Sequence, residues 1–395
     1  MSEYLKQFRR LDDVGTVARG KSKNRPRNDP SLYGGKYPFI QTGDVKRSNL
    51  YITEYSQTYN ERGLAQSKLW KPETLCITIA ANIADTAILK IPACFPDSII
   101  GFIADKDESD VRFIKYCLDT YKLELQSISR GTTQDNLSVD KLLSIKFRIP
   151  PLPIQKKIAS VLSAYDDLIE NNDRRIALLE KMAEEIYREW FVRLRFPGHE
   201  QVTFHKGIPE DWEKKRFDEF CLLQRGYDLP DDKVKPGIYP VIASTSIKTY
   251  HAEFKVRPPV ITTGRSGSLG TVLFVNSLAW PLNTALFVKS FFGNSPYLIY
   301  YTLKFLKLEN FNAGAGIPSL NRNHLGGLYM SVPPKILQNK FDEQILVLFQ
   351  QKENLKKSNE ALKQTRDRLL TRLISGKLSV EDLDIQFPPS MTADP

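Results

Sequence analysis

Residues 150–190 read PPLPIQKKIASVLSAYDDLIENNDRRIALLEKMAEEIYREW, and this stretch decides the fold. After Pro153, apolar side chains recur at alternating intervals of four and three residues, with charged side chains between them. A heptad pattern of this length is typical of a helix in a coiled coil. From Ile154 to Trp190 the helix would be about 55 Å long. The predicted seam positions are Ile158, Leu162, Tyr165, Ile169, Asn172, Ile176, Leu179, Ala183, Ile186 and Trp190.

A second stretch of the same kind begins 183 residues later, where Pro333-Pro334 corresponds to Pro150-Pro151. The two helices are predicted to end near Phe196-Pro197-Gly198 and near Ser375-Gly376, because glycine and proline terminate helices. The second seam is less regular than the first, since three of its ten positions are polar. Its positions are Phe341, Ile345, Leu348, Lys352, Leu355, Asn359, Leu362, Arg366, Leu369 and Leu373.

The two helices could each pack on a separate domain, or they could pair with each other. An antiparallel pair with full overlap places Asn172 opposite Asn359, and it places Tyr165 opposite Arg366 and Leu179 opposite Lys352. A parallel pair would set each asparagine against an apolar residue and leave two polar groups unmatched in the seam. We therefore predict an antiparallel pair.

The duplication extends upstream of both helices, because Ile77-Thr78 matches Ile261-Thr262 and Tyr37-Pro38 matches Tyr239-Pro240. We expect an α+β fold with an internal pseudo-two-fold duplication, in which two tandem mixed α/β domains are joined by two long helices that form an antiparallel coiled coil. The expected parts are a first domain (1–150), a first long helix (151–196), a second domain (197–334), a second long helix (335–378) and a C-terminal tail (379–395).

The net charge of +10 lies in the two predicted domains and not in the helices. Residues 1–150 and 200–337 each carry a net charge of +5, whereas 151–199 and 338–395 are neutral. A basic excess fits a nucleic-acid partner without establishing one. The hydrophobic content of 41% and the charged content of 26% exclude a disordered chain.

The cysteines and histidines are too widely spaced for a zinc site, so we expect no metal and reduced thiols in a cytoplasmic protein. The N-terminus lacks the apolar core of a signal peptide. The uncharged run from Ser266 to Val288 contains glycine, proline and asparagine, which favours buried strands over a membrane span.

Cofactor-binding and nucleophile motifs are absent from the sequence: there is no P-loop, no GxGxxG turn, no [DN]PP[YF] tetrapeptide and no GxSxG elbow. The glycine-rich segment from Gly264 to Gly270 is interpreted as a turn between strands. Pro230-Asp231 followed by Glu253-Phe254-Lys255 resembles the PD…ExK pattern of metal-dependent nucleases. An autonomous nuclease that uses Asp231 and Glu253 is therefore one alternative function, and a scaffold that binds only protein is another.

The positive signals concern DNA binding. The segment Arg19–Arg27 (RGKSKNRPR) carries five cations in nine residues and is interrupted by glycine and proline. Such a segment suits an extended arm or loop that contacts phosphates. Polar residues with side chains that can pair with base edges follow the strand-like segments 37–40 and 239–242, where we expect equivalent loops. Arg225 matches Arg19, and Arg265 lies in the glycine-rich turn. The full candidate set is Arg19, Lys21, Lys23, Arg25, Arg27, Gln41, Thr42, Lys46, Arg47, Arg225, Ser244, Thr245, Ser246, Lys248 and Arg265.

The sequence resembles the specificity subunit of type I restriction-modification systems. The resemblance rests on the segments 149–158 (IPPLPIQKKI), 166–172 (DDLIENN), 174–180 (RRIALLE) and 195–198 (RFPG), on 131–137 (GTTQDNL), and on a second copy around 332–334 and 369–378. It covers essentially the whole chain.

The resemblance implies two target-recognition domains, each contacting one half of a bipartite DNA site, and no catalytic activity in this chain. It implies that the helices separate the two domains and bind two modification (methyltransferase) subunits, which restriction/translocase subunits then join. S-adenosylmethionine, ATP and Mg²⁺ would be bound by those partners and not by this chain.

Overall fold

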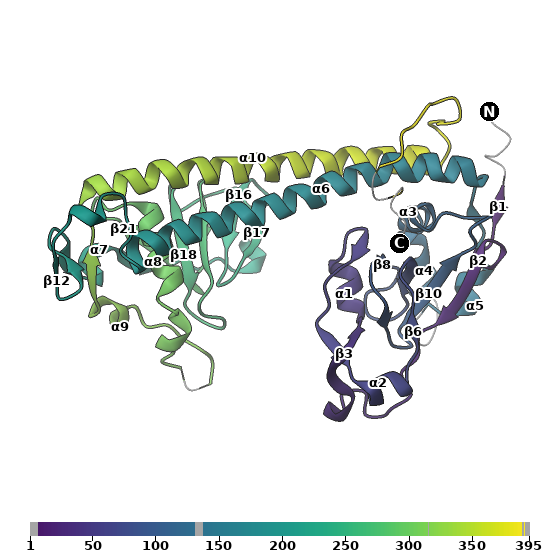
Figure 1. The fold of residues 1–395 in the computed structure, drawn as a ribbon, viewed down its shortest axis with the longest axis horizontal. Coiled ribbons are helices and arrows are strands. Elements are labelled where there is room, and N and C mark those ends of the chain that lie inside the picture. Colours follow the sequence, from purple (N-terminus) through teal and green to yellow (C-terminus); the bar gives the residue numbers. More distant parts are fainter. Residues whose placement is uncertain (1–6, 131–136, 315, 389–390, 392–395) are drawn as a thin grey trace. The chain divides into compact units, whose positions relative to one another are not determined.

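The computed structural model describes residues 7–130, 137–314, 316–388 and 391, and it divides into two compact units. The first unit comprises residues up to Arg174 and from Leu355 onward, and the second comprises Arg175–Asn354. Each unit therefore contains one globular part and a portion of both long helices, which Figure 1 shows as α6 and α10.

The first unit is built on two small sheets and five short helices. The first sheet has the strand order β2 (Gly15–Arg19), β10 (Ile99–Ala104), β7 (Thr74–Thr78), β8 (Thr86–Leu89), β4 (Tyr51–Ile52). The second has the order β5 (Gln57–Tyr59), β3 (Tyr33–Phe39), β9 (Ala93–Cys94), β6 (Leu69–Trp70). The helices are α1 (Thr42–Arg47), α2 (Glu61–Ala65), α3 (Val111–Thr120), α4 (Lys122–Arg130) and α5 (Val139–Ser144), and β1 (Phe8–Arg9) pairs with β11 (Phe147–Arg148).

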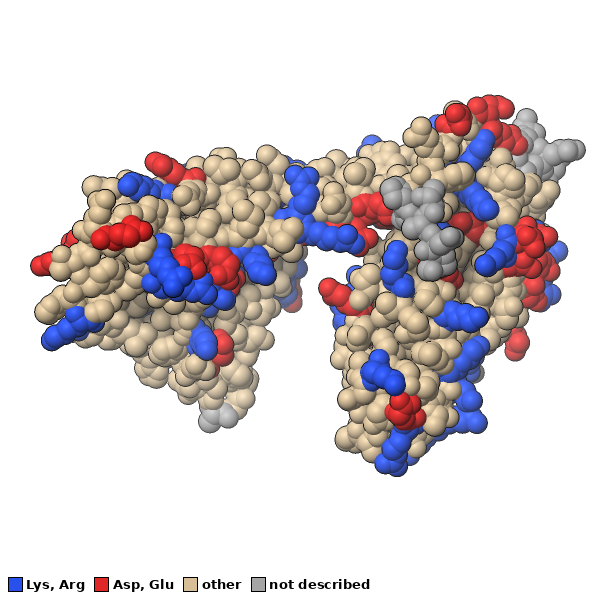
Figure 2. Space-filling model, in the orientation of Figure 1, with Lys and Arg blue, Asp and Glu red and all other residues tan. Residues whose placement is uncertain are grey.

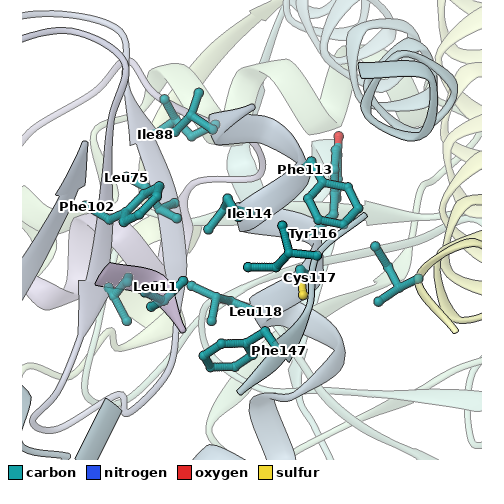
Figure 3. Close-up of a cluster of buried hydrophobic side chains, with 14 of the residues drawn as sticks. Leu11, Leu75, Ile88, Phe102, Phe113, Ile114, Tyr116, Cys117, Leu118 and Phe147 are labelled. Atoms are coloured by element: carbon teal, nitrogen blue, oxygen red, sulfur yellow. The ribbon is translucent and has the colours of Figure 1, made fainter. Parts of the chain in front are cut away.

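Helix α3 covers the first sheet and supplies much of the core of the first unit. It begins at Asp110, whose carboxylate accepts hydrogen bonds from the backbone N–H groups of Arg112 and Phe113. Figure 3 shows Ile114 and other α3 side chains in one buried cluster with Leu75 and Phe102 of the sheet. Cys117 belongs to this cluster, and burial raises the pKa of its thiol to about 12.

The second unit repeats the topology of the first. Its first sheet has the order β15 (Leu222–Arg225), β21 (Ala285–Ser290), β18 (Val260–Gly264), β19 (Val272–Val275), which corresponds to β2-β10-β7-β8. Its second sheet has the order β17 (Ile247–His251), β16 (Tyr239–Ile242), β20 (Trp280–Pro281), which corresponds to β5-β3-β9. The other elements are α7 (Phe217–Phe220), α8 (Pro296–Phe305), α9 (Arg322–Gly326) and the ladders of β12 (Phe204–His205) with β13 (Ile208–Pro209) and of β14 (Glu213–Arg216) with β22 (Tyr329–Val332). The predicted duplication and the α+β class are confirmed.

Two sequence interpretations concern the second unit. The glycine-rich segment after Gly264 connects the antiparallel strands β18 and β19, as predicted. The uncharged run from Ser266 to Val288 forms β19, β20 and most of β21, which are largely buried strands. Within the described residues, no helix has the length and apolar character needed to cross a membrane.

The long helices α6 (Leu152–Tyr187) and α10 (Lys335–Ile374) run antiparallel within each unit, as predicted. In the first unit, Asn172 contacts Asn359 and Asp166 contacts Arg366. In the second unit, Lys352 contacts Glu180. A π-helical turn (Arg188–Val192) continues α6, and the ring of its Trp190 lies 5.8 Å from the ring of Phe341. The alternative in which the helices pack separately is wrong, although each helix also contributes to both hydrophobic cores.

The segment after α10 packs on the first unit. Val380 is buried in its core, Lys157 Nζ donates to the carbonyl oxygen of Glu381, and Ser160 Oγ donates to that of Gln386. The short motif at 131–137 that supported the resemblance lies, except for Leu137, outside the described residues.

Candidate DNA interface and helix pair

The basic segment 19–27 of the first unit begins at the last residue of β2 and continues as a loop, which hydrogen bonds fix to the start of β10, to Phe95 and to the end of α2. Gly20 N–H donates to the carbonyl oxygen of Ile99, and Lys21 N–H donates to that of Phe95. Gln66 Oε1 accepts hydrogen bonds from the backbone N–H groups of Lys23 and Asn24, at 2.6 and 3.0 Å. The loop thus presents its cations on a defined backbone, so that a ligand would bind without having to order it.

In both units, close approach of another backbone segment explains why glycine follows arginine at the start of this loop. A Cβ atom on Gly20 would lie 2.2 Å from the carbonyl oxygen of Pro96, and one on Gly226 would lie 2.2 Å from that of Leu282. Only glycine permits this approach, and it holds Arg19 and Arg225 at equivalent places.

Three arginines of the loop converge on one aspartate, Asp97. Arg27 Nη2 is 2.5 Å from Asp97 Oδ1, and Arg25 Nη2 is 3.5 Å from Asp97 Oδ2. Arg19 Nε donates to the backbone oxygen of Asp97. Lys21 and Lys23 are exposed, and no ion pair involves them in the described part of the chain. In Figure 2, Lys and Arg side chains gather around the end of the first globular part where α2 lies.

The second group of candidates in the first unit lies on a short helix, whereas we had expected a loop. Thr42, Lys46 and Arg47 belong to α1, which forms because Asp44 accepts a hydrogen bond from the backbone N–H of Gln41 at the helix start. Gln41 Nε2 donates to Gln57 Oε1, and Lys46 Nζ donates to Asn82 Oδ1. Arg47 pairs with Asp44.

In the second unit, Ser244, Thr245 and Ser246 form the expected turn between β16 and β17, whereas Lys248 lies on β17 itself. Ser244 Oγ lies 2.8 Å from the carbonyl oxygen of Ser266 and 3.1 Å from that of Thr284, so it fixes neighbouring loops. Thr245 and Ser246 are exposed, and Lys248 Nζ pairs with Asp231 Oδ1 at 2.6 Å.

The structure places Arg225 and Arg265 in one cleft of about 710 Å³ in the second unit. Arg265 Nε donates to the carbonyl oxygen of Asn283 at 2.7 Å. Three further residues that line this cleft have the chemistry to contact DNA, although no basic run or repeat match in the sequence marks them: Gln224, Asn321 and Arg322.

The alternative nuclease site has no support in this geometry. Asp231 pairs with Lys248, and Glu253 is 3.9 Å from Lys235 Nζ, so each carboxylate faces a lysine. Among the described residues, no group of three or more His, Cys, Asp or Glu side chains is arranged to hold a metal ion.

The helix pair covers its predicted seam and matches each of the three polar seam residues of the second helix with a polar residue of the first. Asn172 Nδ2 donates to Asn359 Oδ1 at 2.8 Å, and both side chains are buried. Arg366 pairs with Asp166, which also accepts a hydrogen bond from Tyr116 of α3. The apolar seam residues are buried at Ile158, Leu162, Ile169, Ala183, Trp190, Phe341, Ile345 and Leu373, and partly buried at Tyr165, Ile176, Leu179, Ile186, Leu348, Leu355, Leu362 and Leu369.

Two buried glutamines that the sequence interpretation missed fix the starts of the long helices. Gln155 Nε2 donates to the carbonyl oxygens of Pro150 and Glu108, and its Oε1 accepts from Asp110 N–H. Gln338, at the equivalent position, donates to Pro333 and accepts from Ser295 N–H. Their identity at the same repeat position was the available signal.

Comparison with known proteins identifies the family. The model of the type I restriction modification DNA specificity domain matches residues 5–181 and 209–364. The chain belongs to this family.

A relative along the whole length is the type I restriction enzyme MjaIX specificity subunit of Methanocaldococcus jannaschii, which is 27% identical with 95% of this chain and 94% of the relative covered. The EcoBI specificity subunit of Escherichia coli is 24% identical over 51% of this chain and 44% of its own. The S subunit structure from M. genitalium shares the fold, with a TM-score of 0.58, 19% identity, and 93% and 95% of the two chains covered.

The type I specificity protein described here therefore carries two DNA-specificity domains in one chain. It is a non-catalytic subunit, and catalysis resides on the partner subunits of the restriction-modification system. The nuclease alternative is not supported.

Proposed function

We propose that each unit recognises one half of a bipartite DNA site. The observation that carries this proposal is that two units of the same topology each place an arginine cluster beside the equivalent Arg-Gly turn. In the first unit the cluster surrounds Asp97, and in the second it lines the cleft with Arg225 and Arg265.

The chemistry of the two clusters suits both kinds of DNA contact. Arginine and lysine neutralise phosphates, and this positions a protein on the duplex. Arginine also pairs with guanine, and glutamine or asparagine with adenine, in the major groove. We assign backbone contacts to Arg19, Lys21, Lys23, Arg25, Arg27 and Lys248, and base contacts to residues among Gln41, Thr42, Lys46, Arg47, Gln224, Arg225, Thr245, Ser246, Arg265, Asn321 and Arg322. Ser244 would support its loop without touching DNA, because its hydroxyl lies against two backbone carbonyl oxygens.

The long helices would set the length of the nonspecific spacer between the two half-sites. With 36 and 40 residues they are about 54 and 60 Å long, which exceeds one DNA turn of about 34–36 Å. Two modification subunits would bind the helix pair and the domains beside it, and restriction/translocase subunits would join them. S-adenosylmethionine, ATP and Mg²⁺ would be bound by these partners, in the cytoplasm where the chromosome lies.

The test is to express the chain with its modification subunit and to map methylated adenines across a genome. We expect a motif with two specific parts separated by a spacer of fixed length. Methylation without a split motif would contradict the proposal.

Equilibrium DNA binding by the reconstituted complex separates the proposal from the scaffold alternative. We expect selective binding in which the logarithm of the binding constant falls linearly with the logarithm of the salt concentration, because arginine and lysine neutralise phosphates. A scaffold would show no selective binding in this assay.

A further inference from the structure

The two arginine clusters lie at the same place in the repeated fold. Lys21 N–H donates to Phe95 O in the first unit, and Tyr227 N–H donates to Pro281 O in the second. Likewise, Gly20 N–H donates to Ile99 O, and Gly226 N–H donates to Ala285 O. In both cases the acceptor of the second unit lies 186 residues after that of the first. Asp97 and Asn283 are therefore equivalent positions, each just before the strand β10 or β21.

In both units an arginine donates to the backbone oxygen of this position, although the arginine comes from a different segment. Arg19 donates to Asp97 O in the first unit, and Arg265 donates to Asn283 O in the second. The same contact has thus been built from unrelated sequence positions.

In both units a carboxylate also pairs with exposed arginines of the cluster, two in the first unit and one in the second. In the first unit, Asp97 itself pairs with Arg25 and Arg27. In the second unit, Asn283 Nδ2 donates instead to Asp228, and Asp228 Oδ1 is 3.5 Å from Arg225 Nη2. These arginine side chains are between 49% and 56% exposed, so the pairs face solvent.

Solvent-exposed pairs of this kind are weak, so a phosphate or a base edge can take the carboxylate's place on the guanidinium. The carboxylate nevertheless repels any phosphate that approaches the cluster. DNA that offers only its backbone therefore meets a reduced positive charge, whereas a target sequence supplies further contacts that offset the repulsion. A repulsive element of this kind raises specificity by weakening the wrong complexes.

We propose that Asp97 and Asp228 are specificity-determining carboxylates, which hold the arginine clusters in the free protein and weaken binding to non-target DNA. This inference rests on the proposed function, because it requires that the two units bind DNA. Asp29, the other carboxylate near the first loop, is committed elsewhere: it caps the backbone N–H of Ser31 and accepts from Asn24.

The experiment uses Asp97→Asn in the full chain with its modification subunit, and compares a duplex containing the mapped target with an unrelated duplex over a series of salt concentrations. We expect affinity for the unrelated duplex to rise about five-fold at 0.15 M salt, and the salt slope to steepen by about 0.9, for each additional phosphate neutralised. We expect affinity for the target to change less, so that the specificity ratio falls.

The matched control is Asp107→Asn, which removes an exposed carboxylate beyond the other end of β10 and makes the same change in net charge. It should leave the specificity ratio unchanged. Asp228→Asn should lower discrimination at the other half-site, which duplexes with one intact and one scrambled half-site would show.

Three results have distinct meanings. If Asp97→Asn and Asp107→Asn behave alike, the inference is overturned while the proposed function stands. If Asp97→Asn weakens target binding as much as the double variant Arg25→Gln/Arg27→Gln does, Asp97 only positions the arginines and the inference is again overturned. If the complex with the wild-type chain shows no selective binding, the proposed function itself fails.

Discussion

Individual polar residues explain why the second long helix departs from a regular seam. Each of its three polar seam residues meets a polar partner on the first helix: Lys352 meets Glu180, Asn359 meets Asn172, and Arg366 meets Asp166. The Asn172–Asn359 and Asp166–Arg366 contacts lie inside the seam, where polar groups cost stability when unpaired and fix the register when paired. Lys352 is largely covered, whereas its partner Glu180 is exposed. The irregular sequence of the second helix is thus complementary to the first.

The asparagine pair gives the first prediction. Asn172→Leu should lower the free energy of unfolding by about 1–3 kcal/mol, because Asn359 Oδ1 would lose its donor inside the seam. The double variant Asn172→Leu/Asn359→Leu should recover most of this loss, since it replaces both polar groups. Urea unfolding followed by circular dichroism measures the effect. Asn171→Leu, the same substitution at the exposed neighbour, is the control and should change stability by less than about 0.5 kcal/mol.

The ion pair of Arg366 with Asp166 gives the second prediction. Arg366→Leu should cost about 3–5 kcal/mol, because it leaves the carboxylate of Asp166 buried beside Tyr116 without a cation. Arg366→Leu/Asp166→Asn should recover more than half of that, because an amide oxygen can still accept from the Tyr116 hydroxyl. Thermal unfolding provides the measurement, with the exposed Arg368→Leu as the control. Equal effects at Arg366 and Arg368 would show that the buried pair has no special role.

For individual residues, the sequence predicted the layer of the helix-pair seam correctly, but not the residue that each long side chain contacts. Antiparallel arithmetic placed Arg366 opposite Tyr165 and Lys352 opposite Leu179, and the observed partners are the next residues, Asp166 and Glu180. Heptad positions define which layer a residue occupies, whereas a long arginine or lysine side chain reaches past its own layer to the nearest carboxylate.

Among the elements, the starts of the two long helices are held in the same way, by a buried glutamine at the equivalent position of each helix. Gln155 and Gln338 lie in the first turns and link the proline pair before each helix to the N-terminus of α3 or α8. Three hydrogen bonds of a single buried side chain thus join elements that are far apart in the sequence.

The third prediction concerns these glutamines. Gln155→Leu and Gln338→Leu should each destabilise their own unit by about 2–4 kcal/mol, since both a backbone N–H and backbone carbonyl oxygens lose buried partners. Hydrogen exchange should quicken at the start of α3 in the first variant and at the start of α8 in the second. Gln344→Leu, on the exposed face of α10, should leave both regions protected. Exchange that is unchanged at both helix starts would contradict this role.

The elements that sequence could predict were those with a strong period or a strong repeat. The second long helix ends at Ile374, next to Ser375-Gly376, and β16 (Tyr239–Ile242) coincides with the strand-like segment 239–242. The first long helix, α6, ends earlier than expected, at Tyr187, and a π-helical turn (Arg188–Val192) follows it. The helix α1 was missed because it is only six residues long and has no apolar period, so that its start rests on the capping box formed by Gln41 and Asp44. The cleft with Arg322 was missed because its lining residues come from five separate segments, which only the folded chain brings together.

At the scale of the whole molecule, the alternation of basic and neutral blocks agrees with the proposal that the domains contact DNA and that the helix pair does not. The two blocks with a net charge of +5 contain the proposed DNA contacts, and the neutral blocks contain the helix pair. The sequence could not show how the charge is distributed within a block, because Asp97 is 70 residues from Arg27 and the two meet only through the fold.

The fourth prediction tests whether the helix pair sets the spacer. Deleting residues 173–179 together with 352–358 removes one matched heptad from each helix and keeps Asn172 opposite Asn359. This shortens the pair by about 10.5 Å, or about three base pairs of DNA at about 3.4 Å each. Genome-wide mapping of methylated adenines should therefore give a motif with both half-sites unchanged and a spacer about three base pairs shorter.

The control deletes 173–179 alone, which shifts one helix against the other by a heptad and separates Asn172 from Asn359. This variant should lose methylation, because Asn359 would then lie opposite Tyr165 and Arg366 opposite Ile158, so that both lose their present partners in the seam. An unchanged spacer in the double deletion would show that the helix pair does not set the distance. Altered half-sites would show instead that the heptad contributes to recognition, and would assign DNA contacts to the helices as well as to the two domains.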